Sequence, residues 1–426
     1  MIMARSFITI RVTRGIFRSV LLLTLLTWWG AGWATTKSSH GRGRELAPEA
    51  QAPLWRLDVK ALGYVLQRVR NERESPEAYG SRLCFPAPDQ VIVTFVTGGA
   101  SGSSAPQPPG LAHRGEPDAG LPYRLHALFI DTATGTVRAR REWPTASRWA
   151  WITEAPARKF VVITPERLTL YSPALEPLEH LDLRVTQEAI KDAWRVVPSP
   201  AGRYLVVDYW RAEDEQRTGR GVLRREWIDT DTFRILREWT LTGMAIADKM
   251  RVSDGGTALV GDDIGKPDGP LHRLCLPSKS QPYCGLLNLI SDDTVLSWGL
   301  VPKHQWMDLI STNGDVLAHQ DFLPGEIYNR LATSADGRRL AFALEKGKGG
   351  IEALDIAAHY SLSRIIVYDV AARRPVYSLR GKEHHLKAIS GLALSPDGSE
   401  LALVNQDGIL EEYRLPGNST AKQPAP

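Results

Sequence analysis

The stretch "LALSPDGSELALVNQDGILEEYRL", residues 392–415, decides the fold of this chain. Apolar residues alternate with small or polar ones on both sides of the segment 395–398, SPDG, which predicts two antiparallel strands joined by a tight turn. Pro fixes the φ of the second turn position, Asp397 can bond its own backbone, and Gly398 can adopt a positive φ. A second turn, 405–408, leads to a third strand. Three strands alone are only marginally stable, so the segment needs neighbours.

The same strand–turn–strand pattern recurs along the chain. The clearest further copy is "LATSADGRRLAFAL", residues 331–344, in which Asp336 and Gly337 take the turn positions of Asp397 and Gly398. With the weaker copies the chain contains seven such hairpins. The weaker copies begin at Leu83, Trp149, Trp194, Met250 and Leu287.

A second strand pair follows most hairpins, so that each unit contains four strands. These pairs begin at Leu128, Leu168, Glu226, Met307 and Ile366. In the fourth unit residues 271–284 are expected to supply the outer strands. Repeated four-stranded units of roughly 40 to 45 residues plus insertions are typical of a β-propeller. The predicted fold is therefore an all-β, seven-bladed β-propeller of four-stranded antiparallel blades.

The last unit carries a family resemblance. It reads "HLKAISGLALSPDG", and His385 stands where WD-repeat proteins place a Gly-His pair before the innermost strand. The Trp-Asp pair of that family is replaced by Tyr368-Asp369 and by similar pairs in two other units. Residues 81–415 thus resemble the WD-repeat-like (YVTN and quinoprotein-type) β-propeller superfamily, in a divergent form. The resemblance implies a structural hydrogen bond for His385, and it specifies the fold rather than an activity.

The seventh unit ends at Leu415 and lacks a fourth strand. In related propellers the N-terminus supplies the outer strand of the last blade, and "LWRLDVKAL", residues 54–62, alternates suitably for this role. The alternative is a short helix that continues through Val69. The predicted propeller spans residues 54–415, between a disordered linker at 35–53 and a disordered tail at 416–426.

The N-terminus has the layout of a secretory signal. Four Arg residues precede the uncharged run Val20–Ala34, which predicts a signal peptide over residues 1–34 and export to the periplasm or the extracellular space. An uncleaved segment that anchors the chain to the membrane is the alternative. Without residues 1–34 the net charge of +4 falls to zero, because that segment holds four Arg and no acid. A neutral chain gives no electrostatic basis for binding nucleic acid.

Three Cys residues are present. Cys275 and Cys284 flank the loop "CLPSKSQPYC", and in an exported protein this spacing is compatible with a disulfide. Two unpaired thiols in neighbouring strands are the alternative. None of the three, Cys84 included, has the spacing of a metal site.

Four insertions indicate where a ligand binds. They are residues 98–120, 211–221, 261–269 and 345–363, and all are expected between the second and third strands of their blades, which places them on one face of the ring. The alternative is that tolerated insertions simply accumulate there, and for Trp149 and Trp194 the alternative is core packing between blades. The candidate binding residues on this face are Trp149, Trp194, Trp210, Arg211, Tyr328, Arg330, His359 and Tyr360.

Motifs for catalysis are weak. Asp131, Thr134 and Gly135 match part of a quinone-cofactor propeller motif, but Ala139 stands where the ring-docking Trp belongs. Glu154 and Asp248 are scattered acids without a consistent metal-ligand pattern. The sequence therefore predicts a monomeric, non-catalytic scaffold for a protein, peptide or glycan, with no cofactor and no metal. A metal- or quinone-assisted enzyme with its site in the central channel is the alternative.

Overall fold

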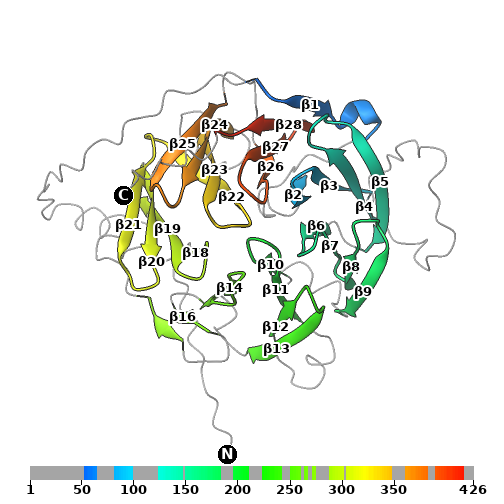
Figure 1. The fold of residues 1–426 in the computed structure, drawn as a ribbon, viewed down its shortest axis with the longest axis horizontal. Coiled ribbons are helices and arrows are strands. Elements are labelled where there is room, and N and C mark those ends of the chain that lie inside the picture. Colours follow the sequence, from blue (N-terminus) through cyan, green and yellow to red (C-terminus); the bar gives the residue numbers. More distant parts are fainter. Residues whose placement is uncertain are drawn as a thin grey trace, which may run out of the picture. The chain divides into compact units, whose positions relative to one another are not determined.

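The computed structural model consists of seven four-stranded antiparallel sheets arranged in a ring (Figure 1). The predicted seven-bladed all-β propeller is thereby confirmed. In six blades the first strand lies nearest the centre and the later strands lie successively outward, whereas in the last blade the outermost strand comes from the N-terminus. The structure describes residues 52–64, 81–98, 123–146, 149–183, 195–210, 223–241, 250–260, 263–266, 271–274, 287–301, 304–347, 360–381 and 389–416.

Blades 1 to 4 follow each other along the chain, and their strands pair in sequence order. Blade 1 contains β2 (Arg82–Ala87), β3 (Gln90–Gly98), β4 (Tyr123–Asp131) and β5 (Val137–Thr145). Blade 2 contains β6 (Trp151–Glu154), β7 (Phe160–Ile163), β8 (Arg167–Tyr171) and β9 (Pro177–Asp182). Blade 3 contains β10 (Arg195–Pro198), β11 (Tyr204–Trp210), β12 (Leu223–Asp229) and β13 (Arg234–Leu241). Blade 4 contains β14 (Met250–Val252), β15 (Ala258–Val260), β16 (Asp263–Gly265) and β17 (His272–Arg273).

Blades 5 to 7 complete the ring. Blade 5 contains β18 (Leu287–Leu289), β19 (Thr294–Val301), β20 (His304–Ser311) and β21 (Val316–Asp321). Blade 6 contains β22 (Glu326–Thr333), β23 (Arg339–Gly347), β24 (Tyr360–Asp369) and β25 (Arg374–Arg380). Blade 7 contains β26 (Ile389–Leu394), β27 (Glu400–Asn405), β28 (Ile409–Arg414) and β1 (Trp55–Asp58).

The core lies between adjacent blades. In β3 the consecutive residues Val91, Ile92 and Val93 are all fully buried, because a neighbouring blade covers each face of the sheet. Most of the outer strand β9 is exposed. Large apolar clusters join neighbouring blades, such as the cluster of blades 6 and 7 that includes Tyr377 and Tyr413. Burial of both sheet faces explains why the second strands read as continuous apolar runs.

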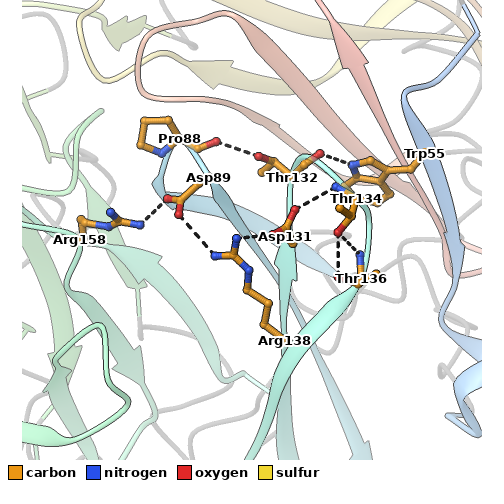
Figure 2. Close-up of polar contacts among 9 residues, drawn as sticks. All are labelled: Trp55, Pro88, Asp89, Asp131, Thr132, Thr134, Thr136, Arg138 and Arg158. Carbon is orange, nitrogen blue, oxygen red and sulfur yellow. Dashed lines mark hydrogen bonds and ion pairs between the residues drawn. The ribbon is translucent and has the colours of Figure 1, made fainter.

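The N-terminal segment closes the ring, as predicted. Strand β1 pairs antiparallel with β28, and its register runs from Trp55 opposite Glu412 to Asp58 opposite Ile409. The indole N–H of Trp55 donates to the carbonyl oxygen of Thr132 in blade 1 at 2.6 Å (Figure 2). The strand is shorter than the predicted 54–62, because residues Lys60–Leu62 form a 3-10 turn that ends at Gly63 with φ 92°.

Blade 4 departs from the sequence-based expectation. Residues 263–265 of the predicted insertion 261–269 form strand β16, which pairs with β15 through Leu259 and Ile264. The outermost strand is His272–Arg273, so the outer pair begins earlier than the predicted 271–284. These strands are only two or three residues long, too short to show the period-two pattern on which strand prediction depends.

The other three insertions lie between second and third strands, as expected. They connect β3 to β4, β11 to β12 and β23 to β24. In blade 6 the insertion is narrower than the predicted 345–363, because β23 continues to Gly347 and β24 begins at Tyr360. Strand pairing in that blade therefore extends well into the segment that the sequence reading left unpaired.

The repeated hairpin turns have the expected geometry in blades 6 and 7. Gly337 and Gly398 have φ of 67° and 68°, the left-handed conformation that favours glycine. Asp336 accepts the Ser334 hydroxyl at 2.6 Å, and Asp397 accepts the Ser395 hydroxyl at 2.8 Å. The predicted family position His385 and the cysteines Cys275 and Cys284 lie outside the described residues.

Candidate interaction face

The two ends of the ring differ in their connections. Because strand directions alternate, the second-to-third connections and the blade-linking segments lie at one end, which we call the insertion face. The tight turns that join first to second and third to fourth strands lie at the other end, the tight-turn face. The long connections 99–122, 211–222 and 348–359 all belong to the insertion face. This end is therefore the candidate interaction face.

Three arginines occupy the same rung of three inner strands. Arg82 pairs with Thr94, Arg195 with Asp208 and Arg330 with Ala343. The second strand of each blade contains a residue that pairs with an Asp at the end of the third strand; these residues are Gln90, Tyr204 and Arg339. The residue that pairs with the arginine lies four positions further along the second strand in all three blades. The equivalence of these rungs places the three side chains at one level of the ring.

An aromatic ring contacts one of these three arginines. The Arg82 guanidinium lies over the Trp151 ring of blade 2, 3.6 Å from the ring centroid. A guanidinium over an aromatic face is held by cation–π attraction while its N–H groups can still donate in the ring plane. Arg195 is exposed, whereas Arg82 and Arg330 are partly buried. Arginines at such a site suit carboxylate or phosphate groups, which accept hydrogen bonds from the guanidinium fork.

Arg330 has an acidic neighbour. Burial raises the pKa of Glu345, while the amide of Asn329, which donates to it at 2.6 Å, and the charge of Arg330 oppose the increase. Arg195 has a different setting, because the side chain opposite it, Asp208, forms a buried pair with Arg225 at 2.7 Å. The three arginines therefore share a level of the ring but differ in electrostatic surroundings.

The structure places only some of the predicted binding residues. Trp149 packs partly buried against the apolar cluster between blades 2 and 3. Tyr328 stacks on Trp298, with ring centroids 4.0 Å apart, and its backbone N–H donates to the Gln305 side chain at 3.0 Å. Both aromatic side chains thus contribute to packing within the ring.

The other predicted binding residues lie at or beyond the edges of the described strands. Trp210 ends β11 and Tyr360 begins β24, so both lie at the edge of an insertion. Trp194, Arg211 and His359 lie outside the described residues. The structure therefore places Arg330 at the same level of the ring as Arg82 and Arg195, in three different blades. The outer part of the predicted site lies outside the described residues.

Two groups with unusual acidity lie in the inner strands of blades 1 and 2: Cys84 is buried within β2, and Glu154 is the partly buried last residue of β6. Burial raises the pKa of Glu154 to about 7, the charge of Asp254 adds to the increase, and hydrogen bonds with its own backbone, Cys84 and Thr153 oppose it. Burial also raises the pKa of the Cys84 thiol, which makes it a poor nucleophile. Asp248 lies outside the described residues.

A metal centre is not evident in the described part of the chain. No group of three or more His, Cys, Asp or Glu residues there is arranged to hold a metal ion. The residues of the partial quinone motif form the tight turn of blade 1, in which Asp131 accepts the backbone N–H of Thr134 at 2.9 Å and Gly135 has φ 68°. Within the described ranges, no helix has the length and apolar character needed to cross a bilayer.

The comparisons with known proteins found matches among solved structures. No protein-family model matches the sequence, and no curated protein matches it either. Among solved structures, the C-terminal WD40 domain of Sif2 is 12% identical with a TM-score of 0.49, covering 86% of this chain and 98% of that domain. A chain of the mitotic checkpoint complex is 12% identical with a TM-score of 0.48, covering 87% and 98%. Hsv2 from Kluyveromyces lactis is 15% identical with a TM-score of 0.37, covering 60% and 69%.

The seven four-stranded blades and the closing strand β1 describe the fold completely. The chain has the fold of a seven-bladed β-propeller. Within this propeller, sequence reasoning named Arg330 but missed Arg82 and Arg195. A signal for Arg195 was present, because it precedes the turn residue Ser199 by four positions, as Arg330 precedes Ser334. Blade 1 lacks a comparable turn serine, so Arg82 could be aligned only through strand pairing.

Proposed function

We propose that this propeller is a non-catalytic interaction scaffold that acts outside the cytoplasm and binds a protein or peptide on its insertion face. A glycan is the alternative ligand. One observation carries the proposal: the three long connections emerge at the same end of the ring, from blades 1, 3 and 6, the blades whose inner strands carry the equivalent arginines Arg82, Arg195 and Arg330.

In this propeller the blades provide stability, and the loops are free to provide recognition. The interior of this ring is held by apolar clusters between blades, which gives a rigid frame. Loops on a rigid frame can vary in length and sequence at little cost to the fold, so binding surfaces concentrate there. The arginine level adds donors for anionic groups close to the axis of the ring. A partner that presents acidic side chains fits this chemistry.

Export is supported only by the sequence of residues 1–34. Four Arg residues, an apolar run and small residues before position 35 form the pattern of a cleaved signal. Fractionation of cells that express the full chain, followed by N-terminal sequencing, tests this part. A mature protein that begins at Thr35 outside the cytoplasm supports it, and an unprocessed cytoplasmic chain contradicts it.

The interaction is tested by shortening the insertions separately. Residues 99–122 and 348–359 are each replaced by a short Gly-Ser linker, and Arg158→Ala on the tight-turn face serves as the control. Partners are crosslinked in the envelope fraction, identified, purified and titrated against each variant. At least a tenfold loss of affinity in one insertion variant, with normal binding by the control, supports the proposal. Equal affinity of the wild type and both insertion variants contradicts it.

The arginine level is tested with the same partner. Arg195→Ala is expected to weaken binding several-fold and to reduce its salt dependence, because a charge-assisted contact with the partner is lost. Arg234→Ala, an exposed arginine of the outer strand β13, is the matched control. Identical affinities for Arg195→Ala and Arg234→Ala exclude Arg195 from the interface.

A further inference from the structure

The seam that closes the ring contains a fully buried carboxyl group. Glu412 of β28 lies directly opposite Trp55 of the N-terminal strand β1. Its relative exposure is 0%, and neither carboxylate oxygen has a hydrogen-bond partner among the described residues. An ionised carboxylate in such a place pays a large desolvation cost without compensation, so the neutral acid is strongly favoured there.

The charged neighbours of Glu412 are mostly acidic. Ala402 lies opposite Glu412 and Glu400 lies opposite Arg414, so these side chains share one face of blade 7. Arg414 is directed to Glu400, with an N–O distance of 3.8 Å. From blade 1, Asp131 approaches the same side of the seam, where it is bonded to Arg138 (Figure 2). Strand β1 contributes no charged residue to this face, because Arg56 and Asp58 alternate with Trp55.

Together these surroundings raise the pKa of Glu412. Burial raises it to about 9, the neighbouring Glu400 carboxyl and the charge of Asp131 add to the increase, and Arg414 opposes it. In an opened seam the carboxyl meets water, and its pKa returns to the ordinary value of about 4.5 for an exposed Glu. The closed seam therefore holds a proton that the open seam releases near neutral pH.

We propose that closure of the ring depends on this proton: the seam is closed while Glu412 is protonated, and ionisation of Glu412 releases strand β1 from β28. The position of Glu412 makes β1 the element that moves. Strand β1 is the outermost strand of blade 7, it is four residues long, and only β28 pairs with it. Separation of this one strand hydrates the carboxylate, whereas the three strands contributed by the C-terminal segment remain paired.

The direction of the pH effect follows from the pKa of Glu412 in the closed seam and in the open seam. Opening is coupled to release of one proton between pH 4.5 and about 9, so the free energy of opening decreases as pH rises through this interval. Below pH 4.5 the closed form has its full stability, and above about 9 the closed form has lost the whole contribution. A change of one pH unit inside the interval favours the open form up to tenfold.

The test measures opening of β1 directly. Amide hydrogen exchange of residues 52–64 is followed in the full chain from pH 6 to pH 9.5, with rates corrected for intrinsic exchange and referred to strand β4. The wild type is expected to lose at least tenfold protection in this segment over the interval, while Glu412→Gln keeps its protection. Parallel profiles for the wild type and Glu412→Gln, or a loss that includes β4 equally, overturn the proposal.

A matched control lies on the other face of the same strand. Glu411 accepts the Tyr413 hydroxyl at 2.7 Å and lies 3.5 Å from Arg56, so Glu411→Gln changes a paired carboxylate of the seam. Its β1 segment is expected to retain the alkaline loss of the wild type. Should Glu412→Gln fail to fold, Glu400→Gln serves instead: removal of this acidic neighbour lowers the pKa of Glu412 in the closed seam, so the loss of protection is expected to end at a lower pH and to be smaller than in the wild type. An unmoved profile in that variant overturns the proposal as well.

Discussion

The tight turns of blades 3 and 4 and those of blades 6 and 7 have the same backbone geometry but take their carboxylates from different places. In blade 7 the Ser395 hydroxyl donates to Asp397 of its own turn at 2.8 Å. In blade 3 the corresponding Ser199 donates at 2.5 Å to Asp254, which belongs to blade 4, because Ala201 occupies the position of the aspartate. The turn serine therefore keeps a carboxylate partner even where the local sequence provides none.

Blade 4 continues this arrangement. The Ser253 hydroxyl donates to Asp292 of blade 5, and a Cβ added to Gly255 would lie 1.6 Å from the Asp292 carboxylate. Each borrowed carboxylate thus joins two blades at the tight-turn face. When the aspartate that accepts from the turn serine belongs to the next repeat, the bond within the turn becomes a contact between two blades. The sequence of one turn can then change while the ring stays connected.

The carboxylates of the turns in blades 3 and 7 differ in electrostatics. Burial opposes ionisation of Asp397, but hydrogen bonds from Ser399 and Ser395 outweigh it and lower its pKa. For Asp254 burial prevails and raises the pKa, the charge of Asp292 adds to it, and bonds from Ser199 and the backbone offset only part. Asp292, the borrowed carboxylate of blade 4, resembles Asp397: burial opposes its ionisation, but hydrogen bonds from Ser253 and Thr257 outweigh it and lower the pKa. Only Asp254 trades its hydrogen bonds against desolvation.

The largest loss of stability is expected where the neighbouring blade leaves no room for a side chain on the turn glycine. Gly202 and Gly337 have nearly equal φ, 70° and 67°, but a Cβ on Gly202 would lie 1.9 Å from the backbone oxygen of Glu154, whereas a Cβ on Gly337 has no neighbour within 3.5 Å. Gly202→Ala is expected to lower the free energy of unfolding by about 3–5 kcal/mol through backbone displacement, and Gly337→Ala by about 1 kcal/mol through φ strain alone.

Urea denaturation of the two variants measures this difference. Because the substitutions are chemically identical and the backbone conformations match, the comparison isolates the packing between blades 2 and 3. Equal destabilisation of Gly202→Ala and Gly337→Ala would show that φ strain, and not the neighbouring blade, dominates at both turns.

The second effect concerns the turn of blade 7. Gly398 has φ 68°, and a Cβ there would lie 2.9 Å from the Arg339 side chain, whose guanidinium donates to the Gly398 and Pro416 carbonyls at 2.8 and 2.7 Å. Gly398→Val is expected to lower the free energy of unfolding by about 2–4 kcal/mol, because a β-branched residue is strained at positive φ and displaces Arg339. The midpoint of thermal unfolding monitors it. An unchanged midpoint would contradict the turn assignment.

A third variant removes a borrowed carboxylate. Asp254→Ala deprives the Ser199 hydroxyl, the Ala201 N–H and the Arg203 N–H of their acceptor, and it is expected to lower the free energy of unfolding by about 2 kcal/mol. Ala201→Asp restores the local Ser-Pro-Asp-Gly motif, so the double variant is expected to recover part of the loss. Ala201→Asp alone places a second carboxylate beside Asp254 and is expected to destabilise. Additive losses in the double variant would contradict this account.

Much of the ring could be predicted from the sequence because its signals are local. Alternating apolar residues and Asp-Gly turns gave the hairpins, and the missing strand of the last unit pointed to residues 54–62, of which Trp55–Asp58 pair with β28. The outer strands of blade 4 were misplaced because they are too short for any period to appear. The alanine in the turn of blade 3 made that copy of the hairpin a weaker one, because Asp254, which completes the turn, lies far along the chain.

The candidate site was less accessible to prediction. Arg330 was found because it begins a recognisable repeat, and Arg195 shares its offset from the turn serine. The packing of Trp149 and Tyr328 against neighbouring blades depends on contacts between segments that are remote in sequence. The raised pKa values of Glu154 and Glu412 likewise depend on tertiary burial and on charges brought in by other strands.

The smallest expected effect is a difference between the turns of blades 3 and 7 in how the free energy of unfolding depends on pH. Glu154 lies beside the blade 3 turn, and burial together with Asp254 raises its pKa to about 7, above the ordinary value of 4.5. The folded protein therefore retains a proton that the unfolded chain loses, so stability contributed by this group declines from pH 4.5 to about 7 and is constant above. Glu154→Gln is expected to remove this decline and to raise the free energy of unfolding at pH 8 by about 1–2 kcal/mol, the full shift being reduced by partial solvent access.

Asp397→Asn provides the opposite case in the turn of blade 7. Because hydrogen bonds lower the pKa of Asp397, its contribution is present at neutral pH and is lost as pH falls through that lowered pKa. The variant should be less stable than the wild type at pH 7 and equal to it in strong acid, whereas Glu154→Gln should be equal at pH 4 and more stable at pH 8. Urea midpoints across this range decide between them. If both variants changed stability with the same sign at pH 7 to 8, the turns of blades 3 and 7 would not differ in proton linkage, and the contrast between these two turns would rest on packing alone.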